Sequence, residues 1–226
     1  MPNHSPVPDL FRDAVLRKGF PCVGARASVR NELCRVRVYP ELGAPDTAAA
    51  VCRDLYEFAA EMLRPGVEFA SFAAVFTGPQ IATEAEFERL LWAHLQQLHD
   101  IDARRFAWDP ETGRDPADPW FSFSVGARAY YVIGMHPSAS RLARRFHCPV
   151  LVFNPHTQFA RLRERGLLDT FKRRVRARDI ALQGSVNPAL LAAGSQAGQY
   201  SGRAVGSDWR CPFQPDPAQQ GGRPRK

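Results

Sequence analysis

Apolar residues at helical spacing define the clearest element of the chain. They follow the capping box Thr83-Glu84-Ala85-Glu86, and the stripe consists of Phe87, Leu90, Leu91, Leu95 and Leu98. A capping box satisfies the free N–H groups at a helix start, and such a stripe is typical of a helix with one buried face. A second stripe from Asp46 to Leu63 ends at Pro65-Gly66 and predicts another amphipathic helix.

Shorter apolar runs bounded by Gly and Pro predict the other elements. Strands are expected at Glu68–Phe76, Phe121–Val125, Ala129–Met135 and Pro149–Phe153, with Gly126 as a hairpin turn. Helices are expected at Pro137–Phe146, Thr157–Arg165 and Leu168–Arg178. The segment from Asp109 to Pro119 is expected to be a loop because three prolines lie among its carboxylates. This order predicts an α+β fold with a mixed, mainly antiparallel sheet flanked by helices.

The ends of the chain carry weaker patterns. Residues 1–18 are expected to form a loosely held arm with one amphipathic turn, and residues 214–226 a disordered tail. No internal repeat or linker divides the rest, so residues 1–213 are predicted to be a single domain.

Composition and charge exclude some classes of protein. Of 226 residues, 45% are hydrophobic and 23% charged, which is ordinary for a globular domain. No stretch approaches the ~20 apolar residues of a membrane span, and Met1-Pro2-Asn3-His4 lacks a signal-peptide pattern. The five cysteines show no CxxC pair, so reduced thiols and a cytoplasmic location are expected. The net charge of +7 comes almost wholly from arginine.

Two predicted strands end at a histidine beside a proline. These are Met135-His136-Pro137 and Asn154-Pro155-His156, and Arg141, Arg144 and Arg145 lie between them. An imidazole at the edge of a sheet is a titratable metal ligand, and clustered arginines favour an anion. The pattern therefore indicates an anionic ligand, a metal, or a cofactor that is both.

Two further candidates carry chemistry of their own. Cys22 is the most suggestive thiol because Pro21 and Gly24 constrain the chain around it, although a free cysteine is more often a small buried hydrophobe. The basic run Lys172–Arg178 lacks the interleaved aromatics of a single-strand binder and any helix-turn-helix context. A solvated helix face is the better interpretation, and nucleic acid is not favoured as a partner.

Several unusual motifs occur together and in order along the chain. They are Phe20-Pro21-Cys22, Trp92 with Leu95-Gln96-Gln97-Leu98-His99-Asp100, Trp108-Asp109-Pro110, Phe121-Ser122-Phe123-Ser124, His136-Pro137 with Ser140-Arg141, Asn154-Pro155-His156-Thr157-Gln158-Phe159, Gln183-Gly184-Ser185, Gln199-Tyr200-Ser201-Gly202-Arg203 and Cys211-Pro212-Phe213. With these motifs the chain resembles the YqcI/YcgG family from about residue 10 to residue 213. The resemblance implies a haem-dependent monooxygenase that N-hydroxylates a guanidino or amine compound such as arginine.

The resemblance also implies partners and site residues. Haem b would need an iron ligand, for which His136 is the first choice and Cys22 or His156 the alternatives, and arginines for its propionates, namely Arg141, Arg144 and Arg145. The guanidino substrate would need an ionised carboxylate, for which the candidates are Asp100, Asp102 and Asp109, then Asp115 and Asp118. His156 is a further catalytic candidate. O2 and an electron-donating reductase would complete the reaction, and a homodimer stays open.

Two other functions remain alternatives to the monooxygenase. One is a haem-binding carrier or sensor without turnover, and the other is a basic nucleic-acid-binding protein. An absorption spectrum separates the monooxygenase and the carrier or sensor, which both require haem, from the nucleic-acid-binding protein, which does not.

Overall fold

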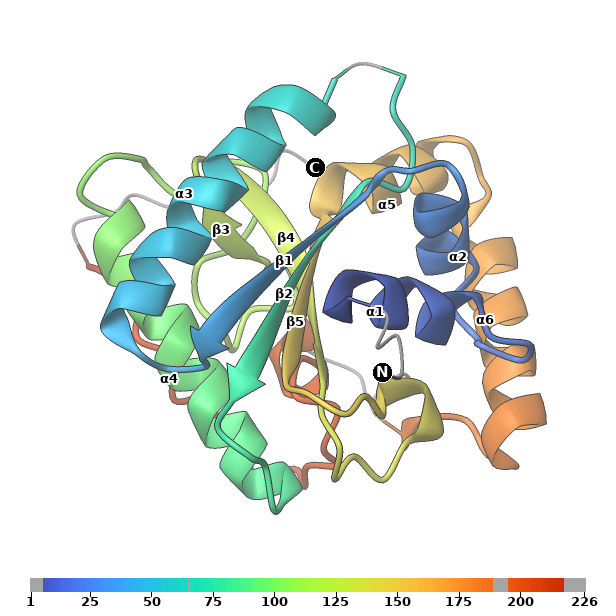
Figure 1. The fold of residues 1–226 in the computed structure, drawn as a ribbon. Helices are drawn as coiled ribbons and strands as arrows, with labels where there is room; N and C mark the ends of the chain where they lie inside the picture. Colours follow the sequence, from blue (N-terminus) through green and yellow to red (C-terminus); the bar gives the residue numbers. More distant parts are fainter. Residues whose placement is uncertain (1–5, 65, 189–194, 218–226) are drawn as a thin grey trace.

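Five strands form one open sheet in the computed structural model, which describes residues 6–64, 66–188 and 195–217 (Figure 1). The strand order is β1-β2-β5-β4-β3. The strands are β1 (Cys34–Glu41), β2 (Ser71–Gly78), β3 (Phe123–Val125), β4 (Arg128–Met135) and β5 (Val150–Pro155). Only β1 and β2 pair in parallel, and the other three neighbouring pairs are antiparallel. The predicted α+β fold with a mixed, mainly antiparallel sheet is confirmed.

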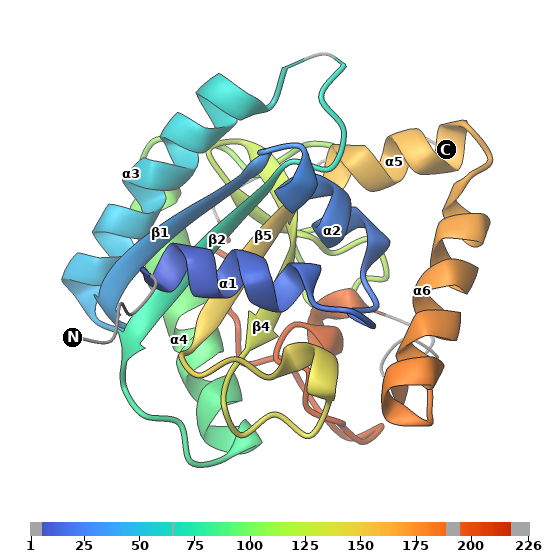
Figure 2. The ribbon, with the colours of Figure 1, turned by 45° about the vertical axis from the view of Figure 1, so that its right-hand side comes forward.

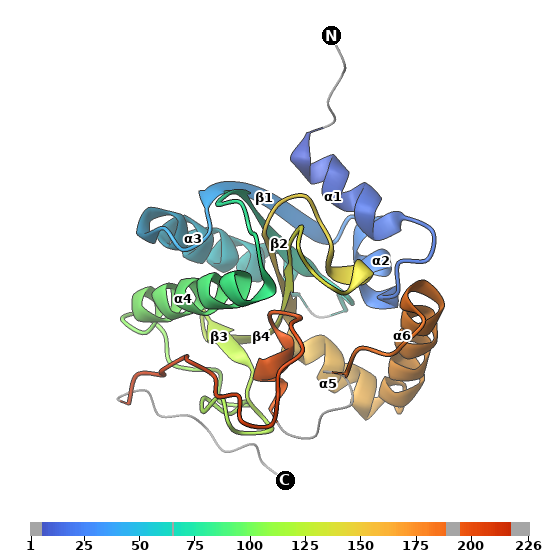
Figure 3. The same ribbon diagram turned by 90° about the horizontal axis from the view of Figure 1, so that it is seen from below.

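Helices cover both faces of this sheet. They are α1 (Val7–Leu16), α2 (Val23–Arg30), α3 (Pro45–Met62), α4 (Glu84–Asp102), α5 (His156–Glu164) and α6 (Leu168–Gln183), with the short 3-10 helices η1 (Leu142–Arg144) and η3 (Gln196–Gln199). Figure 1 shows α3 and α4 on one face, and Figure 3 shows α1 and α2 on the other. Helices α5 and α6 lie beside α2 on that second face.

Two hydrophobic cores result from this layering. Between the sheet and helices α3 and α4 lies a large core that includes Phe58, Phe72, Phe87 and Leu91. On the opposite face Phe11, Val15 and Phe20 pack against alternate strand residues such as Ala73, Val75 and Val150. Every residue of β2 from Ser71 to Phe76 is buried, because successive side chains of a strand point to opposite faces. A continuous apolar run is therefore the expected pattern for this central strand.

The β3–β4 hairpin has the predicted turn at Gly126. Gly126 and Ala127 both have positive φ angles, of 64° and 56°, and Val125 pairs with Arg128 across them. Two central residues with positive φ match the twist of the flanking strands, and glycine adopts that conformation without steric cost. The backbone N–H of Gly126 donates to Asp102 Oδ1 at 2.8 Å, which ties the turn to the end of α4.

The structure corrects the N-terminal prediction. Residues 7–16 form a full helix whose Phe11 and Val15 are each 2% exposed, so this segment is part of the core rather than a loose arm. Strand β1 and helix α2 were not predicted. Arginines alternate with the apolar residues of β1, and α2 has only eight residues, so neither gives a long periodic pattern.

The helix predicted for residues 137–146 is wrong. Only the three residues of η1 are helical, and Arg141 and Arg145 on either side are extended. The chain folds back so that the N–H of His136 donates to the Arg144 carbonyl oxygen at 2.9 Å. Ser138 and Ser140 donate their hydroxyls to groups outside the segment, the Ile81 carbonyl and the Glu84 carboxylate. Short polar side chains that find such partners favour non-helical backbone.

Part of the predicted C-terminal tail is held by the domain. Gln96 and Gln214 exchange two hydrogen bonds, of 2.9 and 3.0 Å, and His99 Nε2 accepts from the Asp216 N–H at 2.9 Å. Residues 218–226 of that tail lie outside the described residues. Within the described ranges, no helix combines the length and the apolar character that crossing a bilayer requires.

Candidate functional site around Cys22

Cys22 caps the N-terminus of α2. Its Sγ accepts a hydrogen bond from the Ala25 N–H at 3.4 Å, and the side chain is half-buried. Burial raises the pKa of the thiol, whereas the N–H groups of Ala25 and Gly24 and the charge of Arg144 act in the opposite direction. Helix N-termini and nearby cations are the surroundings that stabilise thiolates in proteins. Burial is the largest of these influences, so the pKa of the thiol is raised overall and a role for Cys22 as an iron ligand stays a prediction.

Position 24, two residues after Cys22, has little room for a side chain. A Cβ atom at this position would lie 3.1 Å from Phe69 Cδ1 and 3.3 Å from Phe171 Cζ. The two phenyl rings are stacked, with centroids 6.0 Å apart. The first turn of α2 therefore packs directly against aromatic residues from the β2 approach and from α6.

Tyr131 and Arg144 come close to Cys22 from the sheet and from η1. Burial raises the pKa of Tyr131 to about 12, with a smaller lowering from Arg144 and a raising from Cys22. The Tyr131 hydroxyl donates to Gln199 Oε1 at 2.6 Å. Arg144 donates to the carbonyl oxygens of Gly134 at 2.9 Å, Gln199 at 3.1 Å and Tyr200 at 3.2 Å. The charge of Arg144 is thus fixed beside the thiol by three backbone acceptors.

Aromatic residues continue this arrangement toward α5 and α6. Tyr131 and Phe159 meet edge to face at 6.1 Å, and Phe159 and Phe171 do so at 6.2 Å. All three side chains are half-buried, Tyr131 on the sheet and the two phenylalanines on the helices that cover it. We call the group consisting of Cys22, Tyr131, Arg144, Phe159, Phe171 and Gln199 the Cys22 site. Six different elements contribute to it: α2, β4, η1, α5, α6 and η3.

His136 lies in a closed environment. Its exposed fraction is 0%, and its ring stacks on Phe87 with centroids 4.3 Å apart. Burial lowers its pKa to about 4, so the imidazole is neutral near pH 7. Neither ring nitrogen has a hydrogen-bond partner among the described residues, which fits an external ligand, but an iron ligand also needs an open side. His136 as the iron ligand stays a prediction, as do the alternatives Cys22 and His156.

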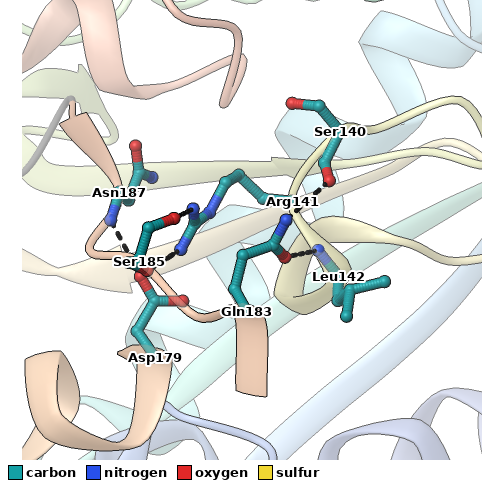
Figure 4. Close-up of polar contacts among 7 residues, drawn as sticks. All are labelled: Ser140, Arg141, Leu142, Asp179, Gln183, Ser185 and Asn187. Carbon is teal, nitrogen blue, oxygen red and sulfur yellow. Dashed lines mark hydrogen bonds and ion pairs between the residues drawn. The ribbon is translucent and has the colours of Figure 1, made fainter. Parts of the chain in front are cut away.

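Arg141 serves a structural ion pair. Its guanidinium contacts Asp179 at 2.6 Å and donates to Ser185 Oγ at 2.9 Å and to the Ser185 carbonyl at 2.7 Å (Figure 4). The Asp179 carboxylate also accepts from the Asn187 N–H at 2.9 Å. Both side chains are buried, so the pair joins the loop after β4 to the end of α6. Arg145, by contrast, donates to the Ala139 carbonyl at 2.6 Å and is exposed.

The three predicted arginines therefore do not form one patch next to His136. Arg141 and Arg145 bond to protein acceptors away from Cys22, and only Arg144 interacts with the thiol. Spacing along a helix led to the expected patch, and this segment is not a helix. Any contact of these arginines with propionates stays a prediction.

His156 and Asp109 lie close together at the end of β5. His156 is the first residue of α5 and half-buried; burial lowers its pKa and the Asp109 charge raises it. Asp109 is buried and accepts from the Ala129 N–H at 2.8 Å and from the Glu111 N–H at 2.9 Å. The carboxylate thus holds the loop after α4 against β4. These hydrogen bonds give Asp109 a structural role, and a catalytic role for Asp109 and His156 stays a prediction.

Asp102 and Asp100 occupy opposite environments at the end of α4. Asp102 is buried, accepts from Tyr56 Oη and the Gly126 N–H at 2.8 Å each, and has its pKa raised to about 6 by burial. Asp100 is exposed and accepts from Gln96 Nε2 at 2.9 Å. Of the two, only Asp100 is placed to meet a ligand from solution.

A large cleft of about 1560 Å³ opens beside Asp100. The end of α4, the loop at residues 115–117 and the C-terminal segment line it, and Asp115 and Trp209 are among the lining residues. Gln199 also lines this cleft, and it accepts the Tyr131 hydrogen bond within the Cys22 site. Gln199 therefore belongs both to the lining of the cleft that contains Asp100 and to the Cys22 site.

Sequence reasoning missed most of the residues around Cys22. Tyr131, Phe159, Phe171 and Gln199 were interpreted as parts of a strand, helices or a motif, without a role. Two of the quoted motifs contained such residues, Gln199 in Gln199-Tyr200-Ser201 and Phe159 in Asn154-Pro155-His156-Thr157-Gln158-Phe159. No three His, Cys, Asp or Glu side chains within the described ranges gather closely enough to bind a metal ion by themselves. A haem iron needs only one protein ligand, so this finding does not bear on haem.

The fold and the site together define an α+β protein with an open five-stranded sheet and a thiol at a helix N-terminus behind it. The chain belongs to the YqcI/YcgG family, whose model matches residues 11–214. This match confirms the resemblance at the level of the family. Searches among curated proteins and among solved structures gave no match.

Proposed function

We propose that this protein is a haem-dependent monooxygenase that hydroxylates a nitrogen of a guanidino or amine substrate. The observation that supports the proposal most is the Cys22 site, a thiol at a helix N-terminus surrounded by half-buried aromatic side chains and one fixed cation. The reaction converts one N–H to N–OH with O2, two electrons and two protons, and it releases water. An external reductase has to supply the electrons.

In this proposal haem b binds at the Cys22 site. Thiolate sulfur is a strong iron ligand. In the protein without haem, burial raises the pKa of Cys22, and the N–H groups of Gly24 and Ala25 together with Arg144 offset only part of that rise, so a bound iron would have to displace the thiol proton. Phe159 and Phe171 offer flat apolar surfaces, which a porphyrin face requires. Bound through a thiolate, haem would supply O2 activation, because such a ligand pushes electron density toward the iron and favours O–O cleavage. His136 and His156 remain the alternative ligands.

The substrate would be recognised by carboxylates of the large cleft. Asp100 and Asp115 line it, and a carboxylate binds a guanidinium through two parallel hydrogen bonds. Gln199 connects this cleft to Tyr131, so a substrate held by its cationic end would extend toward the thiol side. The five cysteines are free, which fits a reducing cytoplasm as the location.

The absorption spectrum of the purified protein tests this proposal. Expressed with a haem precursor, the protein should show a Soret band, and the ferrous carbon-monoxide adduct should show the strong red shift of thiolate ligation. Cys22→Ala should abolish that shift, whereas Cys148→Ala, which replaces another half-buried thiol, should leave it unchanged. A carbon-monoxide adduct without the red shift, with a Soret band that persists in Cys22→Ala but is lost in His136→Ala or His156→Ala, would contradict the ligand assignment.

Turnover separates the enzyme from a haem-binding carrier or sensor. With a reductant and O2, arginine or a related guanidino compound should be consumed and an N-hydroxylated product formed. Binding of haem without consumption of any guanidino or amine compound would contradict the proposed function and favour the carrier.

A further inference from the structure

A cationic groove runs between α2 and α6. Its volume is about 490 Å³, and its lining consists of Val23, Arg26, Ala27, Arg30, Asn31 and Arg178. We call it the α2/α6 groove. The two helices lie side by side in Figures 2 and 3. Three of the six lining residues are arginines and none is a carboxylate, so the groove has a single sign of charge.

The charges of the groove are held in fixed positions. Arg26 donates to the carbonyl oxygens of Leu16 at 2.7 Å and Arg17 at 2.8 Å, and Arg178 donates to that of Phe20 at 2.9 Å. Burial and then the charges of Arg30 and Arg178 lower the pKa of Arg26, which shows that these cations repel one another. Fixed like charges of this kind produce a strong local potential that attracts an anionic partner.

Neighbouring residues extend the positive surface. Arg174 is exposed and precedes Arg178 by one turn of α6, so both lie along the same side of the helix. Arg17 and Lys18 are exposed in the turn after α1, and the next residue, Gly19, would bring a Cβ within 3.8 Å of Leu182 near the end of α6. The positive surface therefore continues from the groove over both helices and the turn between α1 and α2.

The groove begins directly behind Cys22. Val23, the first residue of its lining, follows Cys22 in the chain, and Arg30 ends the same helix. Eight residues of helix span about 12 Å. A partner seated in the groove would thus lie within one short helix of the proposed iron ligand.

We infer that the α2/α6 groove docks a small acidic electron-transfer protein, and this inference rests on the proposed function because that reaction consumes two electrons. Val23 and Ala27 form an apolar centre inside an arginine rim, which is the usual anatomy of a protein interface. Electron-transfer complexes are small, transient and steered by charge, so a groove of this size suffices.

Nucleic acid fits the same groove less well. Part of the donor set is already engaged with backbone carbonyls, namely Arg26 Nη1 and the Nε and Nη2 of Arg178. No aromatic residue lines the groove, so bases would have no stacking surface. The missing stacking surface therefore favours a protein partner over a nucleic acid, and binding of an oligonucleotide is one outcome of the test below.

A charge-reversal pair tests the inference against a matched control. The groove variant is Arg30→Glu with Arg174→Glu, and the control variant is Arg53→Glu with Arg89→Glu, which changes the net charge equally on exposed positions of α3 and α4. The probe is an acidic [2Fe–2S] ferredoxin, titrated against the full chain at low and at moderate salt. A salt-sensitive complex should form, the groove variant should weaken it by at least about tenfold, and the control should change it by less than about twofold.

Three results would overturn the inference. The first is an equal loss of ferredoxin affinity in both variants. The second is the absence of a ferredoxin complex at low salt. The third is that the ferredoxin does not bind, while the groove variant binds a DNA oligonucleotide tenfold more weakly than the unaltered protein does. Binding is measured without turnover, and a haem spectrum of the same preparation separates the two proposals. Ferredoxin binding through the arginines without a haem band contradicts the proposed function alone, whereas haem and hydroxylation with unaltered ferredoxin binding contradict the docking site alone.

Discussion

The two faces of the sheet differ in how completely they are filled. Toward α3 and α4, Phe58, Phe72 and Leu91 have exposed fractions of 0%, and aromatic rings contact one another throughout. Toward α2, α5 and α6, by contrast, Cys22 and Phe159 keep accessible surface. Interiors without a functional task pack to a uniform density. The accessible thiol and ring are therefore one reason to look for a ligand on the second face, and the cleft of about 1560 Å³ lined by Trp209 and Phe213, which pack in the core of the first face, is another place to look.

Replacing an aromatic residue on each face should give the largest contrast. Phe72→Ala removes a fully buried ring of the closed face and should lower the free energy of unfolding by about 4 kcal/mol. Phe159→Ala removes a half-buried ring and should cost about 1 kcal/mol in the haem-free protein, because less apolar area is lost. Urea unfolding of the three proteins measures both values. Equal losses would show that the two faces are packed alike.

The ion pair of the second face should have the next largest effect. Arg141→Ala leaves the Asp179 carboxylate buried without its charged partner, which should lower the free energy of unfolding by about 3 kcal/mol. The double variant Arg141→Met with Asp179→Leu removes both charges and should regain most of that loss. If the double variant is as unstable as the single one, the pair contributes packing rather than compensated charge.

A pH dependence should come from Asp102 beneath the hairpin. Burial raises its pKa in the folded protein to about 6, so between pH 4 and pH 6 the unfolded chain releases a proton that the folded protein still holds. Stability from this group is present at low pH and is lost as the pH rises through 6, by on the order of 2 kcal/mol. In Asp102→Asn that component should vanish. Unfolding curves of both proteins at pH 4, 5, 6 and 7 measure the difference, and parallel pH profiles would contradict it.

The smallest expected effect concerns the link between the Cys22 site and the cleft. Tyr131→Phe removes the 2.6 Å hydrogen bond to Gln199 and keeps the ring, so the free energy of unfolding should fall by about 1 kcal/mol. The same change should alter the response of the ferric haem spectrum to arginine if Gln199 connects substrate and iron. Ser207→Ala, at an exposed lining position of the cleft, serves as the control.

The sequence predicted those parts of the fold that have a strong local pattern. Helices α3 and α4 and the β3–β4 hairpin follow from stripes, a capping box and a glycine turn, which act over a few residues. Strand β1 escaped because an edge strand with alternating arginines has little apolar signal. The extra length of α6 to Gln183 depends on Gly184 as a left-handed cap, with φ 78°, six residues beyond the predicted end.

The candidate site could be predicted only in part for a different reason. Cys22 attracted attention through Pro21 and Gly24, and both constrain the chain as expected. The directions of Arg141 and Arg144 depend instead on Asp179 and on the backbone of Gln199, which lie about 40 and 55 positions later in the chain. Partners so remote leave no local trace. Neighbours in sequence, such as Arg141 and Arg144, therefore point to different parts of the molecule.

The open sheet has a consequence for assembly. At one side the chain shields β4, because the Gly134 N–H donates to the Tyr200 carbonyl at 2.7 Å where β3 no longer pairs. At the other side β1 ends the strand order and presents exposed Arg37, Pro40 and Glu41. Charged residues and proline on an edge strand oppose pairing with another copy. Growth of the sheet across molecules, and with it fibrous aggregation, is thus opposed along β1 and along the part of β4 beyond β3.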